Sequence, residues 1–160
     1  MYYVLACLIV FISGCVHDPP VPHEWLTDTK NMNYTGCFSN TGQIDAKSAS
    51  RGFYLRMLTG FFWPGSRMDA DTVKLTEASG QLEVQALKGM KEIARTKITL
   101  TNGELILTRS GTDDGGVYKA TDRFIRNQDG LVVESVVVSA GVFIIPLAGK
   151  DKAWYFYPLK

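Results

Sequence analysis

The amino-acid sequence predicts a mainly β protein, an antiparallel meander of about eight or nine strands with one short helix near residues 50–62. Short runs that alternate apolar and polar residues recur between turn signals throughout residues 31–160. The clearest pair, "TKITLTNGELILTRS" at residues 96–110, is joined by Asn102-Gly103, a dipeptide that favours a type I′ hairpin turn. We expect a small up-and-down barrel or a two-sheet sandwich, and an open sheet wrapped on the helix is a third arrangement.

Clusters of Gly, Asn, Asp and Ser separate the expected strands, because these residues adopt the backbone angles that tight turns need. In chain order the strands are expected around residues 33–39, 73–75, 82–87, 98–100, 105–107, 117–126, 131–138, 142–147 and 153–157. A turn at Ser139-Ala140-Gly141 is expected to join the seventh strand to the eighth. Pro146 is expected near a strand end or on a sheet edge, since proline cannot donate to the ladder.

The segment "SASRGFYLRMLTGFFWPG" at residues 48–65 departs from this alternation. Large apolar residues recur every four positions, in the series Phe53, Met57, Phe61 and Tyr54, Leu58, Phe62. This spacing predicts a helix face, with Ser50 as its cap and Pro64 at its end. The aromatic residues Phe61, Phe62 and Trp63 then have two interpretations. They pack on the core from the helix, or they contact a bilayer or line a pocket for an apolar ligand.

Length and composition indicate one domain with an ordinary core. Of the 160 residues, 46% are hydrophobic and 21% charged, so the chain can bury a core and general disorder is not expected. The formal net charge is +1 and no basic run occurs, which argues against a nucleic-acid-binding protein. The three cysteines, Cys7, Cys15 and Cys37, lack the paired spacing of a disulfide framework or a CxxC metal site.

The first residues have the pattern of a secretory signal. Every residue from Tyr2 to Phe11 is apolar or aromatic, a stretch shorter than the roughly 20 residues of a membrane-spanning helix. Ile12-Ser13-Gly14-Cys15 follows, and this sequence resembles the lipobox of bacterial lipoproteins. The resemblance implies that residues 1–14 are a signal peptide and that the Cys15 thiol receives a diacylglycerol. A first strand or helix buried in the fold is the alternative for this segment.

The resemblance to lipoproteins also implies a location in the cell. Each buried methylene contributes roughly 0.8 kcal/mol, so two or three acyl chains of palmitate length anchor a protein stably to the membrane. Val16 stands where lipoproteins of enteric-type bacteria carry Asp as an inner-membrane retention signal. We therefore expect a lipid-anchored protein of the cell envelope, on the periplasmic face of the outer membrane if the organism is Gram-negative.

Residues 15–30 are expected to be the lipidated cysteine and a proline-rich tether, and residues 31–160 the single β-rich domain. Both histidines, His17 and His23, lie in the tether, and no Cys, Asp or Glu cluster accompanies them. We expect no metal, no cofactor and no enzyme activity. Without a histidine or a GxSxG motif the domain lacks the usual means of activating a nucleophile.

The sequence leaves three functions to weigh. The glycine of "YTGCF" at residues 34–38 gives a distant similarity to calycins, small barrels that include lipid-anchored lipocalins, although Phe38 stands where their tryptophan is found. The favoured function is a non-catalytic module that binds an apolar ligand or another envelope component. The alternative is a structural or assembly lipoprotein that only docks an envelope protein, and an envelope hydrolase is the least favoured.

Overall fold

The computed structural model describes residues 16–26, 33–45, 48–55, 58, 70–113, 116–142 and 146–160. One 3-10 turn, η1, spans His23–Leu26, and all other described elements are strands. The strands are β1 (Val16–His17), β2 (Gly36–Ser39), β3 (Thr41–Asp45), β4 (Ser48–Tyr54), β5 (Thr72–Ala78), β6 (Gln81–Lys88), β7 (Lys91–Thr99), β8 (Leu105–Asp113), β9 (Gly116–Arg126), β10 (Gly130–Val142) and β11 (Pro146–Pro158).

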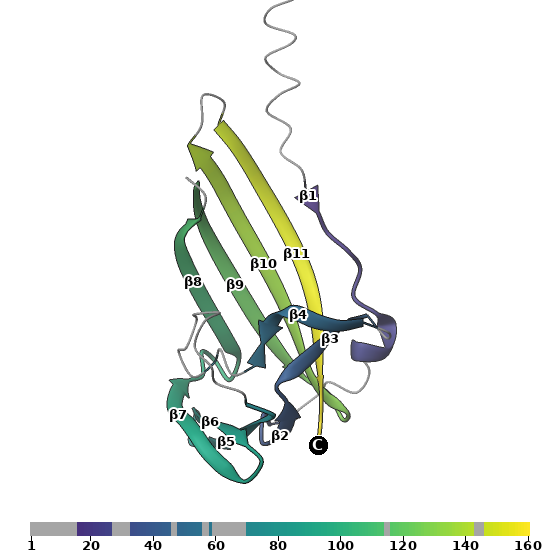
Figure 1. Ribbon diagram of the computed structural model, residues 1–160, viewed down its shortest axis with the longest axis vertical. Helices are drawn as coiled ribbons and strands as arrows, with labels where there is room; N and C mark the ends of the chain where they lie inside the picture. Colours follow the sequence, from purple (N-terminus) through teal and green to yellow (C-terminus); the bar gives the residue numbers. More distant parts are fainter. Residues whose placement is uncertain are drawn as a thin grey trace, which may run out of the picture.

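The strands form two sheets, as Figure 1 shows. The large sheet has the order β4-β3-β11-β10-β9-β8, and the small sheet, at the lower end of the long strands, has the order β2-β5-β6-β7. Neighbouring strands on both paths run antiparallel, and β1 adds a short parallel pairing to β11. The predicted mainly β, antiparallel meander is confirmed, and among the described strands neither sheet closes into a barrel.

The Asn102-Gly103 turn is present, but the two strands that it joins belong to different sheets. Both residues have positive φ angles, 53° and 79°, as a type I′ turn requires. Only Thr101 and Glu104 bridge across it, because β7 pairs with β6 and β8 pairs with β9. The expected hairpin at residues 96–110 is thus a connection from the small sheet to the large one.

Two other local predictions are wrong. Residues 50–54, which were expected to begin a helix, lie in β4, where Tyr54 is paired with Thr41 of β3. The neighbouring strand satisfies the backbone there, and Gly52 has little helical preference. Met57 and residues 59–62 lie outside the described residues. The turn expected at Ser139-Ala140-Gly141 is also absent, because the ladder of β10 with β11 continues to the pair Val142–Pro146.

The main core lies between the two sheets. Side chains of the small sheet, including Phe38, Val73 and Val84, meet side chains of the large sheet, including Phe124 and Val133. The complete buried cluster is Tyr34, Phe38, Leu55, Leu58, Val73, Leu75, Leu82, Val84, Leu100, Leu105, Phe124, Leu131, Val133 and Tyr157. These side chains fill the space between the sheets with contiguous apolar groups, which is the arrangement of a sandwich rather than a hollow barrel.

The opposite face of the large sheet is covered by the N-terminal segment, residues 18–26. Trp25 is only 5% exposed, packs with Val132 and Trp154, and stacks on the ring of Phe156 at 5.6 Å and 23°. The Trp154 Nε1–H donates to the carbonyl oxygen of Pro19 at 3.1 Å. This part of the expected tether is therefore packed against the sheet, because Trp25 brings apolar surface that a free spacer would expose to water.

Candidate functional site

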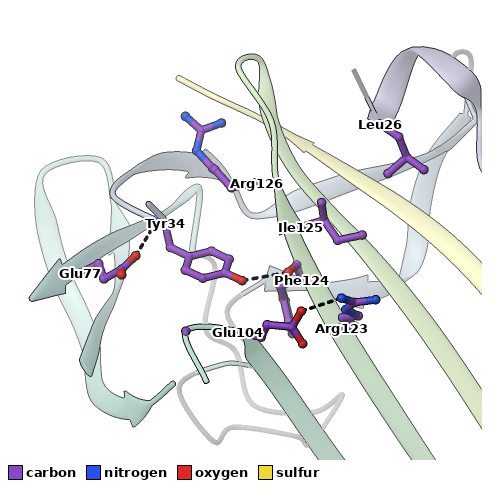
Figure 2. Close-up of a pocket in the computed structure, with 9 residues that line it drawn as sticks. Leu26, Tyr34, Glu77, Glu104, Arg123, Phe124, Ile125 and Arg126 are labelled. Carbon is purple, nitrogen blue, oxygen red and sulfur yellow. Dashed lines mark hydrogen bonds and ion pairs between the residues drawn. The ribbon is translucent and has the colours of Figure 1, made fainter. Parts of the chain in front are cut away.

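A pocket of about 530 Å³ opens at the lower end of the molecule, where β9 ends and η1, β5 and the Asn102-Gly103 turn come together (Figure 2). Its walls mix apolar groups, such as Leu26 and Ile125, with two acidic and two basic side chains. The lining residues are Leu26, Tyr34, Glu77, Gly103, Glu104, Arg123, Phe124, Ile125 and Arg126.

Tyr34 fixes the inner wall of the pocket. Its hydroxyl donates to the carbonyl oxygen of Phe124 at 3.0 Å and accepts from the amide of Leu105 at 3.1 Å. Its own amide donates to the Glu77 carboxylate at 2.8 Å, as seen in Figure 2. Burial raises the pKa of the Tyr34 hydroxyl. A neutral phenol whose hydrogen donates to a carbonyl is suited to holding β8, β9 and the start of β2 together, and poorly suited to attacking a substrate.

Arg123 and Glu104 form an ion pair at the rim. The guanidinium Nη2 lies 2.6 Å from the Glu104 Oε1, and the two side chains are 49% and 45% exposed. The hydrogen bond to Glu104 raises the pKa of Arg123, which keeps its charge. Exposed pairs of this kind contribute little to stability. A ligand can therefore compete for either partner at small cost.

Arg126 lies deeper, at the end of β9, and is only 8% exposed. Its Nη1 donates to the carbonyl oxygen of Gly130 at 2.7 Å, and its guanidinium carbon lies 5.2 Å from the centre of the Phe38 ring. Among the described residues the Nε–H has no hydrogen-bond partner, and burial lowers the pKa of the Arg126 guanidinium. The Asn127 Oδ1 accepts hydrogen bonds from the backbone amides of Asp129 and Gly130. These bonds stabilise the turn that follows Arg126.

A second polar cluster lies above the core, on the face of the large sheet that the small sheet covers. Asp122 is fully buried and accepts from Arg109 Nε at 2.8 Å, from Arg109 Nη2 at 3.1 Å and from the Ser135 hydroxyl at 2.6 Å. The serine donates to a carboxylate that is already paired with a cation, so the cluster is not an arrangement that activates a nucleophile. It is a buried ion pair that joins β8, β9 and β10.

None of the site residues predicted from the sequence lies in the part of the chain that the structure describes. Cys15, with Ile12, Ser13 and Gly14, lies outside the described residues, and so do Phe61, Phe62 and Trp63. Cys37 is half-buried in β2 as a free thiol. His23 is exposed on η1. Among the described residues no group of three His, Cys, Asp or Glu side chains could hold a metal ion.

The pocket residues were missed by sequence reasoning because the contacts that join them span long distances along the chain. The hydrogen bonds of Tyr34 reach residues 43, 71 and 90 positions away. The one local signal is the run Asn127-Gln128-Asp129-Gly130, whose residue types favour a turn and which follows the end of β9 beside the pocket.

Comparisons with protein-family models, with curated proteins and with solved structures found no match for this chain. Within the described ranges, the structure contains no helix whose length and apolar character would let it cross a bilayer. The lipobox resemblance and the geometry of the pocket therefore carry the proposed function.

Proposed function

We propose that this chain is a lipid-anchored protein of the cell envelope whose domain is a non-catalytic module that binds another envelope component. The observation that supports binding is the placement of the pocket relative to Val16, the residue that follows the lipobox. Val16, the residue after Cys15, pairs with Lys150 of β11, whereas Arg126 of the pocket lies in register with Leu131 and Tyr157. At about 3.3 Å per residue, about 23 Å separates Lys150 from Tyr157. An anchor at Cys15 thus leaves the pocket at the end of the long strands remote from the point of attachment.

The pocket favours a ligand with both polar and apolar groups. Arg123 and Arg126 offer donors, Glu77 and Glu104 offer acceptors, and the apolar side chains contribute the rest of the wall. An extended peptide segment has carbonyl acceptors for the arginines, amide donors for the glutamates and apolar side chains for the rest of the wall. A purely apolar ligand is favoured less, because the space between the sheets is occupied by the core cluster.

Replacing Cys15 with alanine is expected to abolish incorporation of a labelled fatty acid and to release the protein from the membrane fraction. The thiol is the acceptor of the lipid in the lipoprotein family that the lipobox resembles. Metabolic labelling and fractionation of cells measure both effects. Cys37→Ala is the matched control, since Cys37 is a half-buried thiol of the folded domain and should leave both results unchanged. Unaltered membrane retention of Cys15→Ala would contradict the anchor.

A photo-crosslinking amino acid at Leu26 is expected to yield a discrete adduct with one envelope component in intact cells. Leu26 lines the pocket and is 37% exposed, so its replacement leaves the core intact. The same amino acid at Met90, a fully exposed position in the turn between β6 and β7, is the control and should give no such adduct. Adducts of equal yield and identity at both positions, or at neither, would contradict a binding role for the pocket.

A further inference from the structure

The upper end of the large sheet carries an exposed surface of lysines and small apolar residues. The cross-strand register places Lys119, Val138 and Lys150 side by side, and Val117 beside Ala140 in the next row. Side chains two residues apart along a strand share a face, so both rows lie on the same face of the sheet. We call this surface the lysine–valine patch: Val117, Lys119, Val138, Ala140 and Lys150.

The patch is open to solvent in the described part of the chain. Val117 is 52% exposed and Val138 is 50% exposed, although valine is usually buried, and the two lysines and Ala140 are exposed too. The segment that covers the lower part of this face reaches only as far as Lys152, whose amine is paired with Asp18 and Glu134. Beyond that pair the face has no described covering segment.

The charge of the patch is of one sign. The described neighbours in the same rows from β8 are Ser110 and Thr112, so the rows contain lysine, valine, alanine and hydroxyl side chains and no described carboxylate. Asp151 lies between Lys150 and Lys152 in the chain and therefore points to the opposite face. Two cations among exposed valines, with no described carboxylate in their rows, complement a surface that is both anionic and apolar.

The position of β1 indicates that the anionic and apolar surface is a lipid bilayer. Val16 is paired with Lys150, so the chain that leads from Cys15 enters the fold directly at the patch. Paired strands lie about 4.8 Å apart, so Val16, the residue that follows the proposed acylated cysteine, lies beside Lys150 at the edge of the patch.

We propose that the lysine–valine patch rests on an anionic membrane surface and orients the anchored domain, with the lysines on lipid phosphates and the valines at the headgroup boundary. This inference rests on the proposed anchor at Cys15. It adds an oriented contact, because a lipid on a free tether would leave the domain able to tumble, whereas an anchor beside a basic, apolar patch turns the face of the large sheet that carries the patch toward the bilayer.

Lysine footprinting on vesicles tests the contact. The chain from Cys15 to Lys160, with Cys37→Ser, is joined through the Cys15 thiol to a maleimide lipid, so the test does not depend on acylation by cells. Vesicles of phosphatidylglycerol and phosphatidylcholine in equal parts are treated with a membrane-impermeant acetylating reagent, and acetylation is followed at each lysine by mass spectrometry. Lys88 and Lys91, exposed at the turn between β6 and β7 in the small sheet, are internal controls.

We expect acetylation of Lys119 and Lys150 to slow at least about threefold on these vesicles relative to the same chain in solution, while Lys88 and Lys91 react at unchanged rates. On phosphatidylcholine alone the protection should fall, and Lys119→Glu should restore the rate at Lys150, whereas Lys91→Glu should not. Unchanged rates at Lys119 and Lys150 would overturn the contact. So would equal protection of all four lysines, or protection that depends on protein concentration and not on lipid. Failure of Cys15 labelling in cells would instead overturn the anchor.

Discussion

Replacing Asp122 with alanine is expected to lower the free energy of unfolding by about 3–5 kcal/mol, as measured by urea denaturation. The carboxylate is fully buried and accepts two hydrogen bonds from Arg109 and one from Ser135. Its removal leaves a guanidinium whose side chain is only 19% exposed without this partner, and leaves the Ser135 hydroxyl without its acceptor. The loss of stability comes mainly from burying the Arg109 and Ser135 groups without Asp122 as their acceptor, and less from the net stabilisation that the ion pair provides.

Two variants distinguish this cause from a general effect of removing charge. Glu104→Ala breaks the ion pair with Arg123, which has a short 2.6 Å contact but half-exposed partners, and should cost no more than about 1 kcal/mol. The double change Arg109→Met with Asp122→Leu removes both buried charges and should recover most of the loss. If Asp122→Ala were no more destabilising than Glu104→Ala, the buried pair would not be a strong constraint on β8, β9 and β10.

Trp25→Ala is expected to cost about 3–5 kcal/mol and to detach the N-terminal segment from the large sheet. The indole is 5% exposed and stacks on Phe156, and its removal uncovers Val132 and Trp154. Hydrogen exchange of residues 18–26 should then rise to that of an unstructured chain, while the core strands β6 and β9 keep their relative protection.

Met90→Ala is the matched control for this change, since a fully exposed methionine should alter stability by less than about 0.5 kcal/mol and leave exchange in residues 18–26 untouched. Unchanged exchange in Trp25→Ala would mean that the Asp18–Lys152 pair and the Trp154–Pro19 hydrogen bond hold the segment without the stacked ring.

The fold class could be predicted from the sequence because alternation and turn residues are local signals. Asn102-Gly103 forms the expected turn with positive φ angles. This local signal does not determine which strands the flanking residues pair with. In the structure β7 pairs with β6 in the small sheet, and β8 pairs with β9 in the large sheet. Large apolar residues recur every four positions from Phe53 onward, which predicts a helix. Residues 50–54 nevertheless form a strand, because β3 supplies hydrogen-bond partners for their backbone.

The pocket and the buried ion pair could not be predicted in this way. Arg109, Asp122 and Ser135 belong to separate strands, and only the register of β8, β9 and β10 brings them together. A one-residue change of register would point Asp122 toward the other face, so its role follows from pairing and not from any motif. Tyr34 likewise depends on partners more than 70 positions away.

The parallel pairing of β1 with β11 also orders events in time. Its partners are the first and the last described strands, so this contact closes the longest loop in the fold and cannot form before the end of the chain is available. Until then Val16 and His17 have no strand to pair with. Attachment of the amino-terminal segment to the edge of the large sheet is therefore expected to be a late step of folding.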